Sequence, residues 1–207
     1  MPSSLIRGKY VVCGVVDRHE AAVIEDGAVF QRDGVIVDVG VHDEIASRHH
    51  PDTIIGSPDD VVIPGLVNSH HHIGLTPIQR GSRDYALELW LATLIAGRTV
   101  DPYLDTLYSA FEMVESGVTA VQHLQVWVPR PLKHVESVID RVLDAYRDIG
   151  MRVSFSYALR DQNQLVYESD DAFLRRLPGE LAAELGAFFD AYSLPLDEQL
   201  GLFEDTC

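Results

Sequence analysis

The stretch VVIPGLVNSHHH, residues 61–72, constrains the fold of this chain more than any other. It predicts a β-strand that passes a proline-glycine step and ends in three consecutive histidines. Because side chains alternate across a strand, we expect the even-numbered residues on one side and the odd-numbered ones on the other: Leu66, Asn68, His70 and His72 against Val67, Ser69 and His71. His70 and His72 could then hold one metal ion, and imidazole nitrogens suit zinc, iron or nickel. A solvated His-rich turn is the alternative.

Ten consecutive residues, IPGLVNSHHH at 63–72, match the pattern apolar-Pro-Gly-apolar-apolar-Asn-x-His-x-His. This is the signature of the first barrel strand of the amidohydrolase superfamily. Trp90-Leu91 and the SGVT stretch at 116–119 follow in the expected order. The chain therefore resembles this superfamily, and most closely its aminohydrolase branch of cytosine and guanine-type deaminases and triazine hydrolases. The resemblance implies that His70 and His72 bind one divalent catalytic metal, zinc by preference and iron as the alternative.

Strands alternate with helices after the histidines, a pattern typical of an α/β barrel or a doubly wound sheet. No glycine-rich phosphate-binding motif follows a strand, which argues against a nucleotide-binding unit. From the resemblance we expect residues 1–60 to form half of a small composite β-sandwich. Residues 61–207 would form the N-terminal part of a (β/α)8 TIM barrel, which needs about 250 residues in all. They supply three barrel strands, which are the one ending in the histidines, Val118–Leu124 and Met151–Leu159.

Turn and cap signals place the smaller elements. In the N-terminal segment we expect three strands separated by two Asp-Gly turns, then a short helix closed by Pro51 that leaves His49 and His50 solvated. The strands are Lys9–Val16, Ala28–Gln31 and Val35–Val39, the turns lie at 25–27 and 32–34, and the helix covers 42–50. Further helices are expected at 85–97, at 131–149, and after the cap Asp101-Pro102, where a buried stripe would comprise Leu104, Leu107, Phe111 and Val114.

Three residues are candidates for substrate binding, because loops at the carboxyl ends of barrel strands carry function. Gln79 lies in the loop after the histidines, His123 stands at the end of the second barrel strand, and Arg160 follows the third. Each has a plainer alternative. Gln79 could be solvated, His123 could be hydrogen-bonded within the barrel wall, and Arg160 could pair with Asp161.

The histidine inventory limits the catalytic machinery of this chain. All nine histidines precede residue 135, namely His19, His42, His49, His50, His70, His71, His72, His123 and His134. The resemblance implies further ligands after the fifth, sixth and eighth strands, two histidines and an aspartate, which would lie beyond Cys207. We therefore expect the N-terminal part of a truncated amidohydrolase that is inactive alone, with its catalytic residues elsewhere.

The reaction implied for the parent protein is metal-assisted hydrolysis of a non-peptide C–N bond. Deamination of an amino-substituted nitrogen heterocycle is preferred, while triazine dechlorination and amide hydrolysis stay open. A metal-free amidohydrolase-like scaffold for assembly is one alternative. A complete small protein with a doubly wound sheet and a surface histidine cluster is another.

Charge and cysteine content limit which partners and which cellular compartment we expect for this protein. Sixteen basic and thirty-two acidic residues give a net charge of −16, which argues against nucleic acid and anionic membranes as partners. The two cysteines, Cys13 and Cys207, supply no disulfide framework, and no signal peptide or membrane span is evident. We expect a cytoplasmic protein with a small-molecule substrate, and a homo-oligomer in the full-length form.

Overall fold

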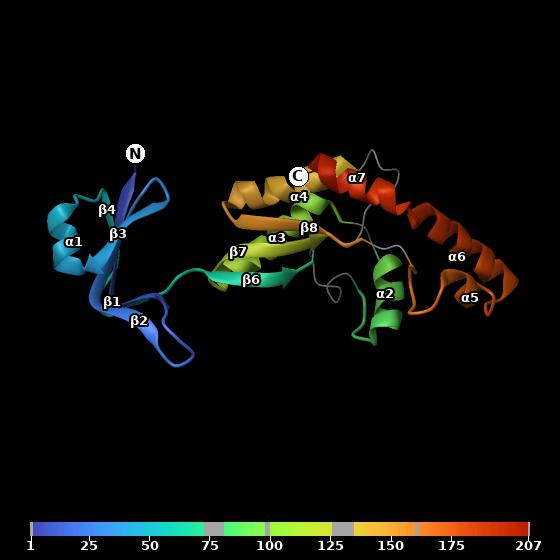
Figure 1. The fold of residues 1–207 in the computed structure, drawn as a ribbon, viewed down its shortest axis with the longest axis horizontal. Helices are drawn as coiled ribbons and strands as arrows, with labels where there is room; N and C mark the ends of the chain where they lie inside the picture. Colours follow the sequence, from blue (N-terminus) through green and yellow to red (C-terminus); the bar gives the residue numbers. More distant parts are fainter. Residues whose placement is uncertain (1, 73–80, 98–99, 126–134, 160–161, 207) are drawn as a thin grey trace. The chain divides into compact units, whose positions relative to one another are not determined.

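The computed structural model describes residues 2–72, 81–97, 100–125, 135–159 and 162–206 (Figure 1). The chain divides into two compact units, residues 1–65 and residues 66–207. Among the helices of the described ranges, none is both long and apolar enough to cross a membrane.

The first unit is a mixed sheet with one short helix. The strand order is β3-β2-β1-β4, and β5 also pairs with β1. Neighbours β1, β2 and β3 are antiparallel, whereas β4 and β5 run parallel to β1. The elements are β1 (Ser3–Val15), β2 (Ala21–Arg32), β3 (Val35–Val41), α1 (His42–Arg48), β4 (Thr53–Gly56) and β5 (Val61–Val62).

One of the two expected turns in this unit is confirmed and the other is wrong. Asp33 and Gly34 have φ angles of 54° and 78° and join β2 to β3, as the Asp-Gly pair predicts. Residues 25–27 instead lie inside β2. A Cβ on Gly27 would come within 2.6 Å of a Val11 methyl carbon, so this glycine permits close approach of the two strands and makes no turn.

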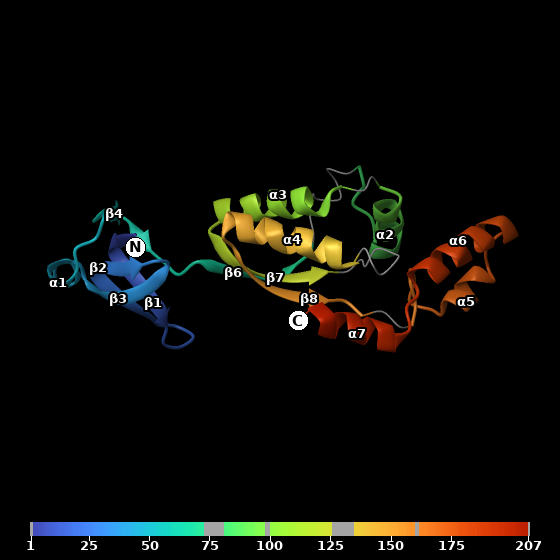
Figure 2. The same cartoon turned by 90° about the horizontal axis from the view of Figure 1, so that it is seen from above.

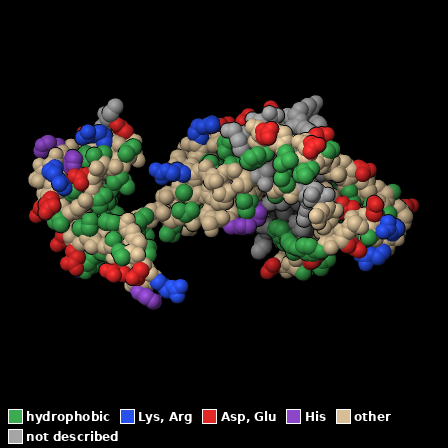
Figure 3. Space-filling view, viewed as in Figure 1, with side chains coloured by type: hydrophobic (Ala, Val, Ile, Leu, Met, Phe, Trp, Pro, Cys, Tyr) green, Lys and Arg blue, Asp and Glu red, His purple; other side chains and the backbone are tan. Residues whose placement is uncertain are grey.

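The core of the first unit lies between the sheet and α1, and comprises Leu5, Ala28, Phe30 and Ile45. His49, expected in solvent, belongs to this packing: its ring stacks on Phe30 at 4.2 Å and its Nε2 lies 2.9 Å from Asp38. That hydrogen bond lowers the pKa of Asp38. His50 is exposed as expected. Hydrophobic side chains also gather on the surface of this unit (Figure 3), among them Val35, Ile36, Val37, Ile54 and Ile55.

The second unit is built on a three-stranded parallel sheet with the order β6-β7-β8, as expected for consecutive strand-helix-strand units. Helices α3 and α4 cover one face of the sheet (Figure 2). The strands are β6 (Leu66–His71), β7 (Val118–Gln125) and β8 (Arg152–Tyr157). The helices are α2 (Leu87–Ile95), α3 (Pro102–Glu115), α4 (Val135–Ile149), α5 (Asp170–Leu174), α6 (Gly179–Tyr192) and α7 (Leu196–Thr206).

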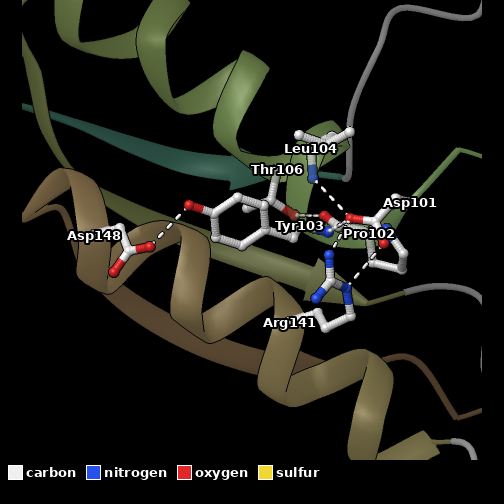
Figure 4. Close-up of polar contacts among 7 residues, drawn as sticks. All are labelled: Asp101, Pro102, Tyr103, Leu104, Thr106, Arg141 and Asp148. Carbon is white, nitrogen blue, oxygen red and sulfur yellow. Dashed lines mark hydrogen bonds and ion pairs between the residues drawn. The ribbon is translucent and has the colours of Figure 1, made fainter.

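Polar contacts at the start of α3 fasten it to α4 (Figure 4). The predicted cap is confirmed, because the Asp101 carboxylate accepts hydrogen bonds from two backbone amides of the first helical turn. Arg141 of α4 donates through Nε to the same carboxylate at 2.9 Å and holds the pKa of Asp101 below its usual value. The Tyr103 hydroxyl donates to Asp148 at 2.8 Å.

The face of α3 that is buried differs from the expected one. Of the predicted stripe, Leu104, Phe111 and Val114 are 58%, 55% and 48% exposed. The buried side instead carries smaller and polar residues, which are Asp105, Thr106, Ser109, Ala110 and Met113. Small side chains let the helix approach the sheet closely, and the Thr106 and Ser109 hydroxyls donate to backbone carbonyls of the preceding turn, which satisfies them inside the core.

Candidate metal centre

The carboxyl end of β6 departs from simple alternation. Pairing with β7 is regular at Asn68, which lies opposite Val121, and then shifts before His71, which lies opposite His123. The Asn68 amide is 3.5 Å from the sulfur of Met113 on α3, and His71 also contacts α3. Asn68 and His71 therefore both face the helices, and the expectation that Asn68 shares a side with His70 and His72 is wrong. The register shift between the two residues is the cause.

His70 and His72 converge at the end of the strand. Their Nε2 atoms lie 3.2 Å apart, and their rings meet edge to face at a centroid distance of 4.9 Å. His71 points elsewhere, with its Nε2 3.2 Å from the Ser109 hydroxyl. The predicted grouping of the outer two histidines, with the middle one apart, is confirmed. Their role as ligands stays a prediction.

The ring of His72 is held in the orientation that a metal ligand needs. Its Nδ1 lies 3.0 Å from the carbonyl oxygen of Leu124 in β7. A carbonyl only accepts, so Nδ1 carries the proton and Nε2 keeps its lone pair, directed at His70. Histidines that bind metals commonly donate their other ring nitrogen to a carbonyl or carboxylate in this manner.

The spacing of the two nitrogens fits a tetrahedral metal. With an Nε2–Nε2 separation of 3.2 Å, an ion at the usual zinc–nitrogen distance of about 2.05 Å from both would subtend an angle of about 100°. This is close to the tetrahedral value. Within the described ranges, neither this strand end nor any other place brings three or more His, Cys, Asp or Glu side chains together around a common point. The described residues thus fit two positions of a metal site.

His123 occupies a closed environment on the helix side of the sheet. Its side chain is fully buried, and its two ring nitrogens lie 2.9 Å from the Tyr146 hydroxyl and 3.1 Å from the Gln125 amide oxygen. Burial lowers the pKa of His123 to about 4, so the ring is neutral at pH 7. Burial also raises the pKa of Tyr146 and lowers that of His71. This placement agrees with the plainer alternative for His123, a histidine that is hydrogen-bonded inside the fold.

The opposite face of the sheet is open and carries other polar side chains. A hollow of about 430 Å³ is lined by Val67, Ser69, Ala120, Gln122, Arg152 and Ser154. Gln122 donates to Ser156 across the strands at 2.7 Å. Gln122 and Arg152 are not among the site residues that the sequence predicts, although the period of two along β7 separates Gln122 from His123. Gln79 and Arg160 lie outside the described residues.

No protein-family model matches the chain. Among curated proteins, it is similar to the 5′-deoxyadenosine deaminase of Methanosarcina mazei, with 30% identity over 164 residues. That alignment takes in 77% of this chain and 34% of the relative. The chain belongs to the amidohydrolase superfamily. Within the superfamily it falls in the aminohydrolase branch, as the sequence resemblance predicts, and it spans about a third of the length of this relative.

Solved structures of amidohydrolases share the fold. Atrazine chlorohydrolase TrzN from Arthrobacter aurescens, complexed with zinc, superposes with a TM-score of 0.60 at 21% identity, over 93% of this chain and 44% of that one. An adenosine deaminase from Xanthomonas campestris with bound zinc gives a TM-score of 0.58 at 24% identity, over 89% and 48% of the two chains. At this identity the likeness establishes a common α/β fold.

Proposed function

We propose that this chain contributes the first two metal ligands of a hydrolase that cleaves a non-peptide C–N bond. Deamination of an amino-substituted nitrogen heterocycle is the preferred reaction. The observation that carries the proposal is the His70–His72 pair, whose Nε2 atoms lie 3.2 Å apart at the carboxyl end of a parallel strand. A relative named as a deaminase supports the reaction class, and zinc in two solved neighbours supports the metal.

The residues of the chain would hold the metal from one side. His72 is fixed by the Leu124 carbonyl, so its Nε2 stays aimed at the shared position, and His70 completes the pair. When bound, a divalent ion, zinc by preference and iron as the alternative, would activate water and polarise the substrate as a Lewis acid. The net charge of −16 favours a small-molecule substrate over a polyanionic partner.

The substrate would be contacted from the loops beyond the strands. We assign Gln79 and Arg160 to this role, since each follows a strand whose carboxyl end faces the metal position. His123, predicted as a further contact, is buried and hydrogen-bonded at both nitrogens, so we assign it to supporting the wall behind the ligands. Gln122, on the open face of the same strand, takes its place as a candidate contact.

Two histidines leave a four- or five-coordinate site incomplete. In this proposal residues 61–207 are the first part of a TIM barrel, residues 1–60 are half of a composite β-sandwich, and the other ligands and the general base come from further polypeptide. The 207-residue chain alone would then bind metal weakly and turn over no substrate. The full-length form is proposed to be a homo-oligomer.

The test is an assay of the 207-residue chain, and of the longest form of the protein that contains it, against aminopurine nucleosides, aminopyrimidines and aminotriazines with zinc present. We expect ammonia release from the longer form only, and its loss in His70→Ala and His72→Ala. His50→Ala, an exposed histidine of the first unit, is the matched control and should keep full activity. Turnover by the monomeric 207-residue chain, or activity that survives both ligand substitutions, would overturn the proposal.

A further inference from the structure

Three aromatic rings form a row across the three neighbouring strands of the second unit. His71 of β6 pairs with His123 of β7, which pairs with Phe155 of β8. The His123 ring stacks on Phe155 at 5.2 Å with an angle of 8° between the planes, and meets the His71 ring edge to face at 6.2 Å. The Tyr146 ring of α4 packs edge-on against His123 at 5.7 Å. We call His71, His123 and Phe155 the ring row.

One hydrogen bond fastens the middle of the ring row to α4. The Gln125 amide oxygen accepts from His123 Nε2 at 3.1 Å, so Nδ1 of the same ring is the unprotonated nitrogen. The Tyr146 hydroxyl therefore donates to that Nδ1 at 2.9 Å. Both groups are buried, and burial keeps the imidazole neutral and the phenol protonated, as this pattern of donors requires.

A second hydrogen bond fastens the end of the ring row to α3. The Ser109 hydroxyl donates to the carbonyl of Thr106 at 3.0 Å, which uses its single proton. Its oxygen is then free to accept from His71 Nε2 at 3.2 Å. The ring row is thus held at both helices by directed contacts, and a rotation of His71 would break one of them.

The ring row lies where the backbone pairing of β6 is irregular. The register shifts between Asn68 and His71, so the ladder alone does not fix the last residues of the strand. The next residues along the two strands are His72 and Leu124, and they make the 3.0 Å contact that orients the His72 ring. Placing His71 opposite His123 therefore places His72 beside the Leu124 carbonyl.

We propose that His71 is a positioning residue: by holding the ring row to Ser109 it sets the register of the strand end and so aims the Nε2 of His72 at that of His70. The consequence for metal affinity rests on the proposed function. The consequence for the His72 ring does not, because the Leu124 contact joins two groups of this chain and its effect on the ring can be measured with no metal added. The two consequences can therefore be tested separately.

The experiment uses the 207-residue chain with ¹⁵N-labelled histidine in two variants and a control. His71→Leu removes the hydrogen bond to Ser109, while His71→Gln keeps a side-chain donor that can reach it. The control is Ile139→Ala, which opens the core of α4 at a buried position outside the ring row. Ser109→Ala replaces His71→Leu if that variant does not fold, since it removes the other partner of the same hydrogen bond.

The first readout is the tautomer of His72 in the metal-free protein, from its ring ¹⁵N shifts. We expect one Nδ1-protonated form in the wild type, in His71→Gln and in Ile139→Ala, and a mixture of tautomers in His71→Leu or Ser109→Ala. A mixture of equal extent in Ile139→Ala would show a general loss of stability and overturn the proposal. An unchanged tautomer in His71→Leu and Ser109→Ala would also overturn it.

The second readout is zinc affinity, measured by competition with a chromophoric chelator. We expect a loss of roughly 10- to 100-fold in His71→Leu, the usual cost of removing a group that orients a ligand, and little loss in His71→Gln. If His70→Ala and His72→Ala bind zinc as well as the wild type, the proposed function fails. The tautomer result then still decides whether His71 positions His72.

Discussion

The buried ring of His123 makes a specific prediction about stability in acid. Its side chain has no exposed surface, and burial lowers its pKa from the usual 6.5 to about 4. Among the residues that the structure describes, those in contact with this ring carry no negative charge: His71 of β6 and Phe155 of β8 lie on either side, and Tyr146 and Gln125 bind its nitrogens. The nearby His71 and His72 lower the pKa further.

Acid should destabilise the folded chain, because the unfolded chain binds more protons than the folded one. Between pH 6.5 and about 4 the unfolded chain binds a proton on this histidine and the folded chain does not, so protons favour unfolding. The unfolding free energy that depends on the neutral His123 ring is fully present above pH 6.5 and is lost as the pH falls to 4. The difference between the usual pKa of 6.5 and the lowered pKa of about 4, at 1.36 kcal/mol for each pH unit, amounts to about 3 kcal/mol of unfolding free energy.

The assay is urea unfolding followed by circular dichroism at several pH values from 7.5 to 4, for the wild type and for His123→Gln. Glutamine has no proton to gain, so the stability advantage of the wild type should shrink by about 3 kcal/mol across this range. Taking the difference removes the contributions of titrating groups that do not interact with His123. A difference that stays constant from pH 7 to pH 4 would show that His123 is not a buried neutral histidine.

Three further predictions concern stability. Tyr146→Phe should lower the unfolding free energy by about 1 to 3 kcal/mol, because it leaves a buried imidazole nitrogen without a donor; urea unfolding at pH 7.5 measures it, and no loss would contradict the hydrogen bond. Gly56→Ala should destabilise the first unit by more than about 1 kcal/mol, since φ is +81° and a Cβ would lie 2.4 Å from a carbonyl oxygen of β1. Gly34→Ala, at φ +78° with open space around it, is its control, and hydrogen exchange that protects both variants equally would refute the steric argument. Phe111→Ser should leave stability within about 0.5 kcal/mol of the wild type because the ring is 55% exposed, and urea unfolding at pH 7.5 measures it; a large loss of stability would mean that the ring is buried.

The sequence predicts those features that depend on a few adjacent residues. The Asp101 cap depends on one side chain and the amides of the next turn, and the structure has it. The grouping of His70 with His72 depends on a period of two over three residues, and the structure has that as well. The three parallel strands follow from apolar runs separated by helical segments.

Features that depend on partners far along the chain could not be predicted in the same way. The position of Asn68 is decided by a register shift against β7, some fifty residues away in the sequence. His49 is packed rather than solvated because its ring stacks on that of Phe30, which lies in β2. For α3, periodicity identifies an apolar face but not the surface against which the helix packs, so the sequence predicts the stripe containing Phe111 in the core, whereas Ser109 lies there.

The central claim is that His70 and His72 together hold a metal ion, and zinc calorimetry on the 207-residue chain tests it most directly. The account predicts weak binding of one zinc ion per chain that disappears in His70→Ala and in His72→Ala, is reduced in His71→Ala, and is unchanged in His50→Ala. Binding that survives both outer substitutions, or that is lost equally in all three variants of the triplet, would contradict it.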